Sequence, residues 1–428
     1  MSHRRVVITG MGVISPQGET VDGLYRAQIN GKSAVGYITR FDASSLPTRI
    51  AAECRNFKLD KYLKANDRIK SAGLNTQFAL AATHAALSDA GLNDKQSKFS
   101  RIGVYLGAGE GRQDFERLMP LLYRTTSHEN MQLDVVKFEQ QSKSTFQVDS
   151  EREQELHMVA GNVARQFKLG GPNYACLTAC AAGSQAIGEG ADIIRRGDAE
   201  IMVTGGSHTM IHPFGITGFN LLTALCTNND DPERASCPFD YRRNGFVMGE
   251  GAGILILEEY EHAKKRGAKI YAELTGYGTT ADAYRVTDSC PDGRGAVASM
   301  RDALRDAQLN ADDIGYINAH GTSTVVNDKG ETAAIKTLFG DKAKQVPVSS
   351  SKSMMGHLIA AAGAVEAIIC VKTLQHGVLP PTINYEVPDP DCDLDYIPNV
   401  AREKKVSHVM SNSFGFGGQN VALIMSRI

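Results

Sequence analysis

The sequence predicts an α/β protein built from two similar halves, each with a mixed, mostly parallel sheet covered by helices. Apolar strand-like runs alternate with helix-like segments, which is typical of layered α/β units. The same order of segments then occurs a second time, which indicates an internal duplication. A chain of 428 residues with 42% hydrophobic residues is also long enough for more than one simple core.

The first half opens on the strand-like run RVVITGMG (5–12). A helical segment ending in AALSDAGLND (85–94) stops at a polar cluster, and the strand-like IGVYLGAGEG (102–111) follows it. A turn of small residues then leads into the helix AAGSQAIGEGADII (181–194). The glycine-rich loop and apolar strand of GFVMGEGAGILILEE (245–259) close this half.

The second half repeats this order of strand, helix, strand, turn, apolar helix and glycine-rich loop with strand. Its segments are KIYAELTGYG (269–278), DALRDAQLNA (302–311), IGYINAHGTS (314–323), SKSMMGH (351–357), LIAAAGAVEAIIC (358–370) and GFGGQNVALIMS (415–426). We therefore divide the chain into an N-terminal half, 1–265, and a C-terminal half, 266–428. A duplication would bring functional loops of both halves together in one cleft.

Residues 112–158 have no counterpart in the second half. They are polar and include TTSHENMQ and KFEQQSKSTFQVDSEREQE. We expect a partly helical insertion here. Its place in the chain suits a lid or a subunit contact, and it suits a passive surface excursion equally well.

Composition argues against several classes of protein. The net charge of −2 gives no bulk attraction to nucleic acid or to an anionic membrane. The eight cysteines are scattered, unlike the dense framework of a small secreted protein. The first apolar run is short and lacks a small-x-small cleavage site. The longest one, LIAAAGAVEAIICV (358–371), is interrupted by Glu366 and too short to span a bilayer. We expect a soluble cytoplasmic protein with reduced thiols.

Cys180 is the first candidate for chemistry, because it lies among small residues between a probable strand and a helix. A thiol at a helix N-terminus gains from the helix dipole, which favours the thiolate and lowers the pKa. A buried structural cysteine is the alternative. A metal site is disfavoured because the Cys176-x3-Cys180 spacing lacks a second ligand pair, and a disulfide is disfavoured by a reducing compartment.

Two histidines follow in the second half. His320 comes directly after a predicted strand, and His357 stands at the start of an apolar helix. Either alone could be a satisfied structural residue, but polar groups at strand ends are where α/β folds place their chemistry. By the duplication, both loops face the loop of Cys180. Lys352 lies five residues before His357, and Glu331 could pair with it and orient the site.

Several motifs occur in a family order and at family spacing: TACAAG (178–183), NAHGTST (318–324), NDKGE (327–331), SSSKSMMGH (349–357), LIAAAGAVEA (358–367) and SNSFGFGGQN (411–420). Together they resemble the elongating β-ketoacyl-acyl carrier protein synthases of the thiolase superfamily. The resemblance covers essentially the whole chain. It is closest to the second class of fatty-acid condensing enzymes and to the ketosynthase-alpha subunits of type II polyketide synthases. It implies a thiolase-like, five-layered αβαβα fold and a dimer.

The resemblance also implies catalytic roles. Cys180 is similar to the nucleophile that accepts an acyl chain as a thioester. His320 and His357 resemble the pair that promotes decarboxylation of the malonyl group and steadies the enolate. Lys352 and Glu331 look like the supporting ion pair. A soft nucleophile suits thioester exchange, and imidazole N–H donors suit an enolate oxygen.

Substrate-binding roles follow from the same resemblance. Thr322 and Thr324 are similar to the threonines that hydrogen-bond the phosphopantetheine arm. Phe416 looks like the gate beside the nucleophile, with its backbone amide joining that of Cys180 in an oxyanion hole. Residues 210–225, MIHPFGITGFNLLTAL, would suit the lining of an acyl pocket, and ordinary core packing explains them equally well. No metal or redox cofactor is expected, because the substrates are carried on phosphopantetheine.

The implied partner is an acidic acyl carrier protein. One candidate docking patch consists of Lys58, Lys61, Lys64, Arg68 and Lys70. A plain solvated face is the alternative for this patch. The second partner is another subunit, either a copy of this chain or a chain-length-factor-like protein.

Departures from the family pattern point away from a housekeeping enzyme. Val325-Val326 stands where Pro-Leu is common, and Asn244 where Asp is common, which favours a specialised polyketide or polyene pathway. Three other readings are disfavoured. A degradative thiolase would carry a cysteine in the last glycine-rich loop, an initiating enzyme would have Asn at His357, and a chain-length factor would lack Cys180.

Overall fold

Ten strands form one continuous sheet in the computed structural model, which describes residues 4–64, 67–92, 101–109, 111, 114–285 and 287–428. Strands from the first half occupy one end of the sheet, in the order β5 (Asn173–Cys176), β4 (Ile102–Ala108), β6 (Ile201–His208), β7 (Gly251–Glu259) and β1 (Val6–Ile14). Strands from the second half continue it as β8 (Ala272–Ala281), β14 (Gln419–Ser426), β13 (His408–Gly415), β9 (Tyr316–Asn318) and β10 (Val348–Ser349). The division of the chain at residue 265 stays a prediction.

Strand direction changes along the sheet. The strand pairs at both ends of the sheet are parallel. At one end β4 pairs with β5 and with β6, and at the other end β9 pairs with β13 and with β10. The pairs in the middle are antiparallel. The two halves meet where β1 pairs with β8 at Val7 and Ile8. The predicted α/β class with a mixed sheet is confirmed.

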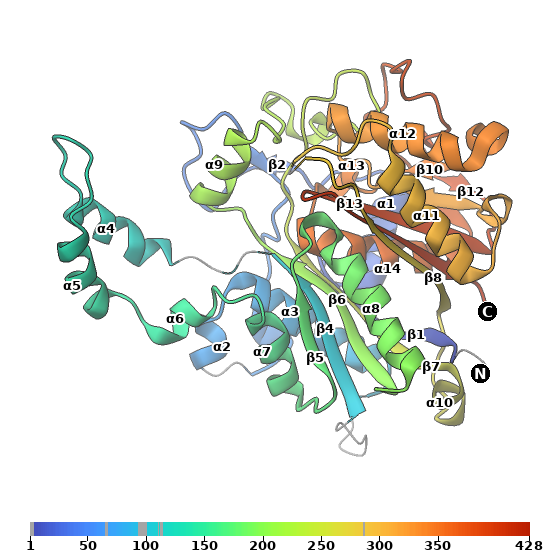
Figure 1. Ribbon diagram of the computed structural model, residues 1–428, viewed down its shortest axis with the longest axis horizontal. Coiled ribbons are helices and arrows are strands. Elements are labelled where there is room, and N and C mark those ends of the chain that lie inside the picture. Colours follow the sequence, from blue (N-terminus) through green and yellow to red (C-terminus); the bar gives the residue numbers. More distant parts are fainter. Residues whose placement is uncertain (1–3, 65–66, 93–100, 110, 112–113, 286) are drawn as a thin grey trace.

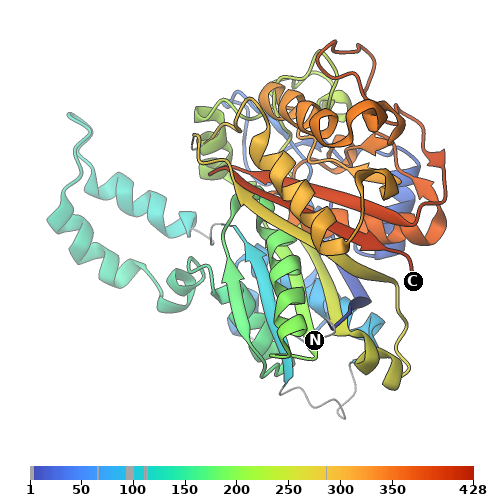
Figure 2. The same cartoon turned by 45° about the vertical axis from the view of Figure 1, so that its right-hand side comes forward.

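The two ends of the sheet stack over a shared middle layer of helices (Figures 1 and 2). This layer contains α8 (Ala182–Arg196) and α14 (Ala362–His376), which contact each other and strands of both halves. Helices α3 (Leu74–Asp89) and α7 (Met158–Phe167) cover the outer face of the first half. Helix α11 (Arg294–Ala307), with α12 (Val325–Phe339) packed against it, covers that of the second half. The predicted five-layered αβαβα arrangement is therefore confirmed.

Each interface between layers has its own apolar core. The central core joins Ile187 of α8 and Ile368 of α14 with Leu255 of β7 and Leu423 of β14. Two further cores lie under the outer helices of the first and second halves. The central core explains why the residues of α14 from Ala362 to Leu374 are all buried, since both faces of the helix are covered by sheet.

Two turns in the middle layer occupy equivalent positions in the two halves, and their first residues even share the same backbone conformation. The 3-10 turn η3 (Ala179–Ala181) leads into α8, and η7 (Ile359–Ala361) leads into α14. Ala179 and Ile359 each open their turn with a positive φ, 47° and 45°. The turns approach closely: a Cβ on Gly183 would lie 2.7 Å from the carbonyl oxygen of Ala360. The run of small residues around Cys180 is what permits this approach.

Shorter elements complete the described chain. They are α1 (Val21–Ile29), β2 (Gly36–Tyr37), β3 (Ile50–Ala51), η1 (Leu59–Lys61), α2 (Asp67–Ser71), α9 (Pro213–Leu221), η4 (Pro232–Arg234), α10 (Tyr260–Lys265), η5 (Ala311–Asp313), η6 (Gly340–Gln345), α13 (Lys352–Met355), β11 (Val378–Leu379) and β12 (Arg402–Glu403). The stretch Ile359–His376 is long and apolar enough to cross a membrane, but 89% of it is buried inside the protein. Its composition is that of a core helix.

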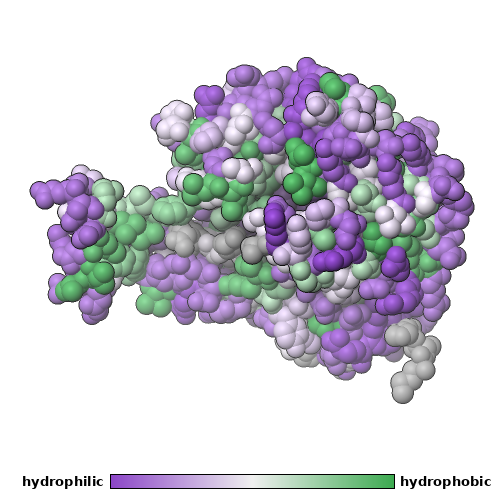
Figure 3. All heavy atoms as spheres, turned by 45° about the horizontal axis from the view of Figure 1, so that its top comes forward, coloured by the Kyte–Doolittle hydropathy of each residue, from purple (hydrophilic) through white to green (hydrophobic). Residues whose placement is uncertain are grey.

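The insertion forms an arm that projects from the body (Figure 1). It contains α4 (Phe115–Thr125), α5 (Val135–Thr145) and α6 (Val148–Arg152), so the expected helical content is confirmed for residues 114–158; residues 112–113 lie outside the described residues. The arm exposes large apolar side chains (Figure 3), namely Met119, Tyr123, Met131, Leu133, Val135, Val136 and Val148.

Candidate active site

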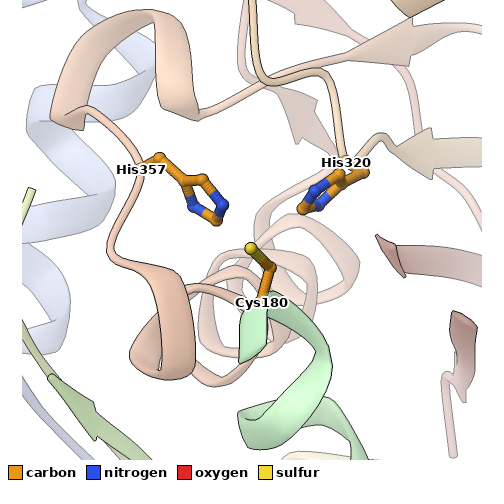
Figure 4. A group of neighbouring side chains, drawn as sticks. All are labelled: Cys180, His320 and His357. Atoms are coloured by element: carbon orange, nitrogen blue, oxygen red, sulfur yellow. The ribbon is translucent and has the colours of Figure 1, made fainter. Parts of the chain in front are cut away.

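One thiol and two imidazoles converge between the two halves. Cys180 comes from η3, His320 from the loop after β9, and His357 from the turn after α13. Figure 4 shows the three side chains pointing toward one another, and their sulfur and nitrogen atoms lie within 4.8 Å of one another. The predicted meeting of these residues is confirmed. Their catalytic roles stay predictions.

Backbone geometry holds the sulfur of Cys180 in place. Ala179 adopts a left-handed conformation that an L-residue rarely takes, and the chain turns there so that Cys180 opens the approach to α8. The side chain is buried, with 5% of the residue exposed. The backbone N–H groups of Phe416 and of Cys180 both act to lower the pKa of this thiol. The two amides that were expected to form an oxyanion hole therefore both influence the sulfur, and the oxyanion hole itself stays a prediction.

The pKa of Cys180 contradicts the expectation that a helix N-terminus lowers it. Burial raises the pKa of this thiol to about 12, against the positive charge of Lys352 and the two backbone N–H groups. The partial charge at a helix end acts over one turn, and it does not outweigh the cost of a thiolate without water around it. In the free protein Cys180 is therefore a thiol that must lose its proton during the reaction.

Both histidines are neutral at physiological pH. Burial, the charge of Lys352 and a neighbouring imidazole hold the pKa of each well below its usual range. His357 accepts a hydrogen bond at Nδ1 from the backbone N–H of Ile359, 3.2 Å away, which assigns its proton to Nε2. Among the described residues, His357 Nε2 and His320 Nδ1 have no hydrogen-bond partner. His357 is thus a donor, whereas His320 keeps an acceptor nitrogen.

Glu331 positions His320 from behind. Its two carboxylate oxygens accept the backbone N–H groups of His320 and Gly321, at 2.9 and 2.8 Å. Asn412 donates its side-chain amide to the same carboxylate at 3.1 Å. Burial raises the pKa of Glu331 to about 7. This carboxylate therefore fixes the loop that carries the imidazole.

The predicted ion pair between Lys352 and Glu331 is wrong. Lys352 Nζ lies 2.5 Å from Glu366 Oε1, and both side chains are fully buried. Glu366 is on α14, whereas Glu331 is on α12 and is occupied by backbone donors. The sequence contained a signal for the true partner, because Glu366 is the only charged residue within the apolar run 358–371. A buried acid requires a cation beside it.

A cavity of about 60 Å³ leads to the three side chains. It is lined by Cys180, Phe246, Thr287, Ser289, His320, Thr322, Thr324, Val326, Asn327, His357, Phe414, Gly415 and Phe416. The hydroxyl oxygens of Thr322 and Thr324 are 2.8 Å apart. The two threonines and Phe416 thus line the cavity that leads to the sulfur, and their role in binding a substrate stays a prediction.

An apolar cluster surrounds Cys180 on its other side. Ile211, Ile216 and Leu225, all within the segment 210–225 that was expected to line an acyl pocket, are buried in this cluster with Cys180. The segment therefore packs beside Cys180. Whether it lines an acyl pocket or is ordinary core packing stays a prediction.

The thiol and the imidazoles are also residue types that bind zinc. The charge around them argues against that use. Lys352 is the largest charged influence on the pKa of Cys180, and its charge also lowers the pKa of both histidines. A buried ammonium close enough to shift the pKa values of these three side chains repels a divalent cation and stabilises a thiolate or an enolate. The arrangement suits chemistry on a transient anion.

The candidate basic docking patch is only partly free. Lys58, Lys64 and Lys70 are exposed, whereas Lys61 pairs with Glu19 at 3.0 Å. The side chain of Arg68 lies outside the described residues. The exposed lysines fit either a docking face or a solvated surface.

Comparison with known proteins agrees with this geometry. Residues 3–263 match the family described as "Beta-ketoacyl synthase, N-terminal domain", and residues 271–386 match "Beta-ketoacyl synthase, C-terminal domain". The 3-oxoacyl-[acyl-carrier-protein] synthase 2 of Coxiella burnetii is 44% identical over 429 residues, covering 100% of both chains.

Two solved structures are similar over their whole length. One is a type II polyketide synthase acyl-carrier protein in complex with its ketosynthase bound to the hexaketide, with a TM-score of 0.87, 35% identity and 100% coverage of both chains. The other is the ishigamide ketosynthase/chain length factor, with a TM-score of 0.88, 34% identity and 100% coverage of both chains. The match of both domains and of full-length relatives shows that this chain belongs to the beta-ketoacyl synthase family.

Proposed function

We propose that this protein is a β-ketoacyl-acyl carrier protein synthase, an acyltransferase that forms a carbon-carbon bond. It joins an acyl chain held on Cys180 to a malonyl group, which loses carbon dioxide in the reaction. The observation that carries the proposal is the convergence of Cys180, His320 and His357 at one cavity, in a chain that belongs to this family.

The first half-reaction loads the acyl chain. His320 takes the proton of the Cys180 thiol, and the sulfur attacks the thioester carbonyl of the incoming acyl carrier. The N–H groups of Cys180 and Phe416 stabilise the oxyanion that forms. The bond to the pantetheine sulfur then breaks, and His320 returns the proton to that leaving thiolate. Lys352 supports the transient thiolate through its charge.

The second half-reaction extends the chain. The malonyl thioester loses carbon dioxide, and the electron pair of the broken bond forms an enolate. The N–H of His357, assigned to Nε2, and the imidazole of His320 donate hydrogen bonds to the enolate oxygen. The enolate carbon attacks the acyl-Cys180 carbonyl, the carbon-sulfur bond breaks, and the thiolate of Cys180 takes up one proton from solvent, which balances the carbon dioxide lost from the malonyl carboxylate. No atom changes its oxidation state through an external oxidant or reductant, so no metal or redox cofactor is needed.

Substrates reach the site on the phosphopantetheine of an acyl carrier protein. The hydroxyls of Thr322 and Thr324 line the cavity and hydrogen-bond this arm. A similar ketosynthase has been solved with its acyl-carrier protein, which supports the same kind of partner here. The exposed Lys58, Lys64 and Lys70 provide positive charge for an acidic carrier.

The protein works as a dimer. Strand β5 lies at the edge of the sheet. Tyr174 within it is 54% exposed, and Leu177 directly after it is 48% exposed. An apolar strand at a sheet edge favours pairing with another subunit. The apolar arm at 114–152 gives the dimer a second contact. All eight cysteines are free, which fits a reducing cytoplasm.

Two kinds of subunit could pair with the exposed edge at β5 and the arm, and each corresponds to a different pathway. A homodimer would elongate fatty acids, as the names of the curated relatives suggest. A heterodimer with a chain-length-factor-like subunit would act in a polyketide or polyene pathway, as in the ishigamide ketosynthase/chain length factor. Val325-Val326 and Asn244 favour the second.

Purified protein tests both proposals. It is incubated with malonyl carrier and acyl carriers of graded chain length, with and without a candidate partner subunit, and products are identified by mass spectrometry. Elongation by the chain alone supports the homodimer, and elongation that requires the partner supports the heterodimer. Absence of elongation under both conditions contradicts the proposed function.

A further inference from the structure

His208 is a buried imidazole without an assigned task. It is the last residue of β6 and is 0% exposed. Among the described residues, neither of its ring nitrogens has a hydrogen-bond partner. Burying a polar group without a partner is costly, and native proteins rarely do so. A fully buried imidazole with both nitrogens free therefore offers one donor and one acceptor that no described side chain uses.

The ring is neutral and can serve as both donor and acceptor. Burial, with a smaller effect of His212, lowers the pKa of His208 to about 3. A neutral imidazole offers one N–H and one bare nitrogen. It therefore suits a hydroxyl or carbonyl oxygen, which can pair with the N–H or with the bare nitrogen.

His208 lies close to the reaction centre. Its ring is near enough to His357 to affect the pKa of that imidazole. On another side it packs over Gly109, where a Cβ would lie 2.0 Å from His208 Nδ1, so only glycine leaves room for the ring. Gly109, the residue after β4, thus leaves space for the ring of His208, which lies close to His357.

A cavity of about 500 Å³ begins at the residues that follow His208 in the chain. Thr209, Ile211 and His212 line it together with Asn75, whose side-chain oxygen is also buried without a partner among the described residues. Ile211 thus belongs both to the apolar cluster beside Cys180 and to the wall of a cavity lined by polar as well as apolar side chains.

We propose that His208 recognises an oxygen on the acyl chain, so that the enzyme prefers chains that carry a hydroxyl or carbonyl group beyond the thioester over plain alkyl chains. This proposal rests on the proposed function, because it concerns the chain bound to Cys180. A plain alkyl chain would leave the imidazole buried and unpaired, whereas an oxygenated chain would satisfy it. Sites built around a buried hydrogen bond discriminate strongly against substrates that lack the partner.

The test measures acyl transfer to Cys180 from pantetheine thioesters of a plain octanoyl chain and of octanoyl chains with a single hydroxyl or carbonyl group at successive positions. Mass spectrometry follows acyl-enzyme formation and gives kcat/KM for each chain. The ratio of each oxygenated chain to the plain chain is compared among wild type, His208→Leu and His208→Gln. Leucine keeps the volume but cannot hydrogen-bond, whereas glutamine keeps a donor and an acceptor.

Wild type should prefer at least one oxygenated chain by about tenfold or more. His208→Leu should abolish that preference, and His208→Gln should retain most of it. A wild type that prefers the plain chain over every oxygenated chain would overturn the proposal. It would also be overturned if His208→Leu lowered kcat/KM equally for plain and oxygenated chains while His208→Gln left the ratio between them unchanged. Loading of plain octanoyl on Cys180 in wild type keeps the proposed function separate, since its absence would count against that function instead.

Discussion

Lys352 and Glu366 form a fully buried ion pair, with 2.5 Å between Nζ and Oε1, that joins α13 to the central helix α14. The ammonium of Lys352 is the charge with the largest effect on the pKa of Cys180, and it lowers that pKa. Burial raises the pKa of Glu366, so its carboxylate depends on Lys352 to stay charged. The ammonium of Lys352 thus lowers the pKa of Cys180, while the carboxylate of Glu366 compensates the cost of burying that ammonium.

Removing one partner of this pair should destabilise the fold more than removing both. Glu366→Gln leaves the ammonium of Lys352 buried without a carboxylate, and the free energy of unfolding should fall by about 3–5 kcal/mol. The double variant Lys352→Met, Glu366→Met should lose less, because no uncompensated charge remains. Urea unfolding followed by circular dichroism measures both. A Glu366→Gln protein as stable as wild type would contradict the pairing.

The raised pKa of Cys180 predicts how its reactivity changes with pH. Because the pKa is about 12, the thiolate fraction should increase about tenfold per pH unit from pH 7 to pH 9, without a plateau. Lys352→Met should slow alkylation at every pH, since the positive charge that lowers this pKa is gone.

Alkylation of Cys180 by iodoacetamide, mapped by peptide mass spectrometry, measures this rate. Cys176→Ala serves as the control, because Cys176 is only half-buried and also has its pKa raised to about 12. A plateau below pH 9 in both proteins would show a thiol activated in the free enzyme.

The two histidines should divide the two half-reactions. His357→Ala should reduce decarboxylation more than acylation, because His357 Nδ1 is occupied by the Ile359 N–H and the ring can only donate. His320→Ala should reduce acylation more than His357→Ala does, because His320 takes the thiol proton. Release of carbon dioxide from malonyl carrier and the rate of acyl-enzyme formation separate the steps. Equal loss of both steps in His357→Ala would refute this division.

Glu331 should link stability to pH. Its pKa is raised by burial to about 7 in the folded protein, above the ordinary value of a carboxyl, so the folded state binds this proton more tightly than the unfolded state. The contribution to stability is complete below about pH 4.5 and is lost as the pH rises to about 7, by about 3 kcal/mol. Glu331→Gln should remove this dependence.

Unfolding free energies of wild type and Glu331→Gln at pH 5, 6 and 7 measure it. The same variant should lose activity without losing the Lys352–Glu366 pair, since the carboxylate of Glu331 holds the His320 loop and not the ammonium. A constant difference in stability across this pH range would contradict the assignment.

The order of segments and the catalytic motifs could be predicted because each depends on local sequence. Each catalytic residue lies in a short contiguous motif: small residues surround Cys180, and turns carry His320 and His357. Such motifs can be read without knowing the tertiary contacts. The duplicated order then places both halves around one centre, and the turns at Ala179 and Ile359 repeat even in backbone conformation. Local pattern and internal symmetry were sufficient for the α/β class and for the meeting of Cys180, His320 and His357, whereas the five layers followed from the family resemblance.

Pairings between distant elements could not be predicted in the same way. Glu331 and Glu366 are both acids that follow a catalytic loop, and only packing assigns one to backbone amides and the other to Lys352. The pKa of Cys180 was misjudged for a related reason. The helix end is visible in the sequence, but the burial that outweighs it comes from segments more than a hundred residues away, such as the loop of Phe416.

The most direct test is to locate the acyl group on the enzyme. The protein is incubated with an acyl carrier thioester, digested, and analysed by mass spectrometry before and after addition of malonyl carrier, with Cys180→Ala as the control. We expect an acyl mass on the peptide with Cys180, its loss with release of carbon dioxide when malonyl carrier is added, and no label in the folded Cys180→Ala protein. Acylation of Cys176, or a label on Cys180 that malonyl carrier cannot remove, would contradict it.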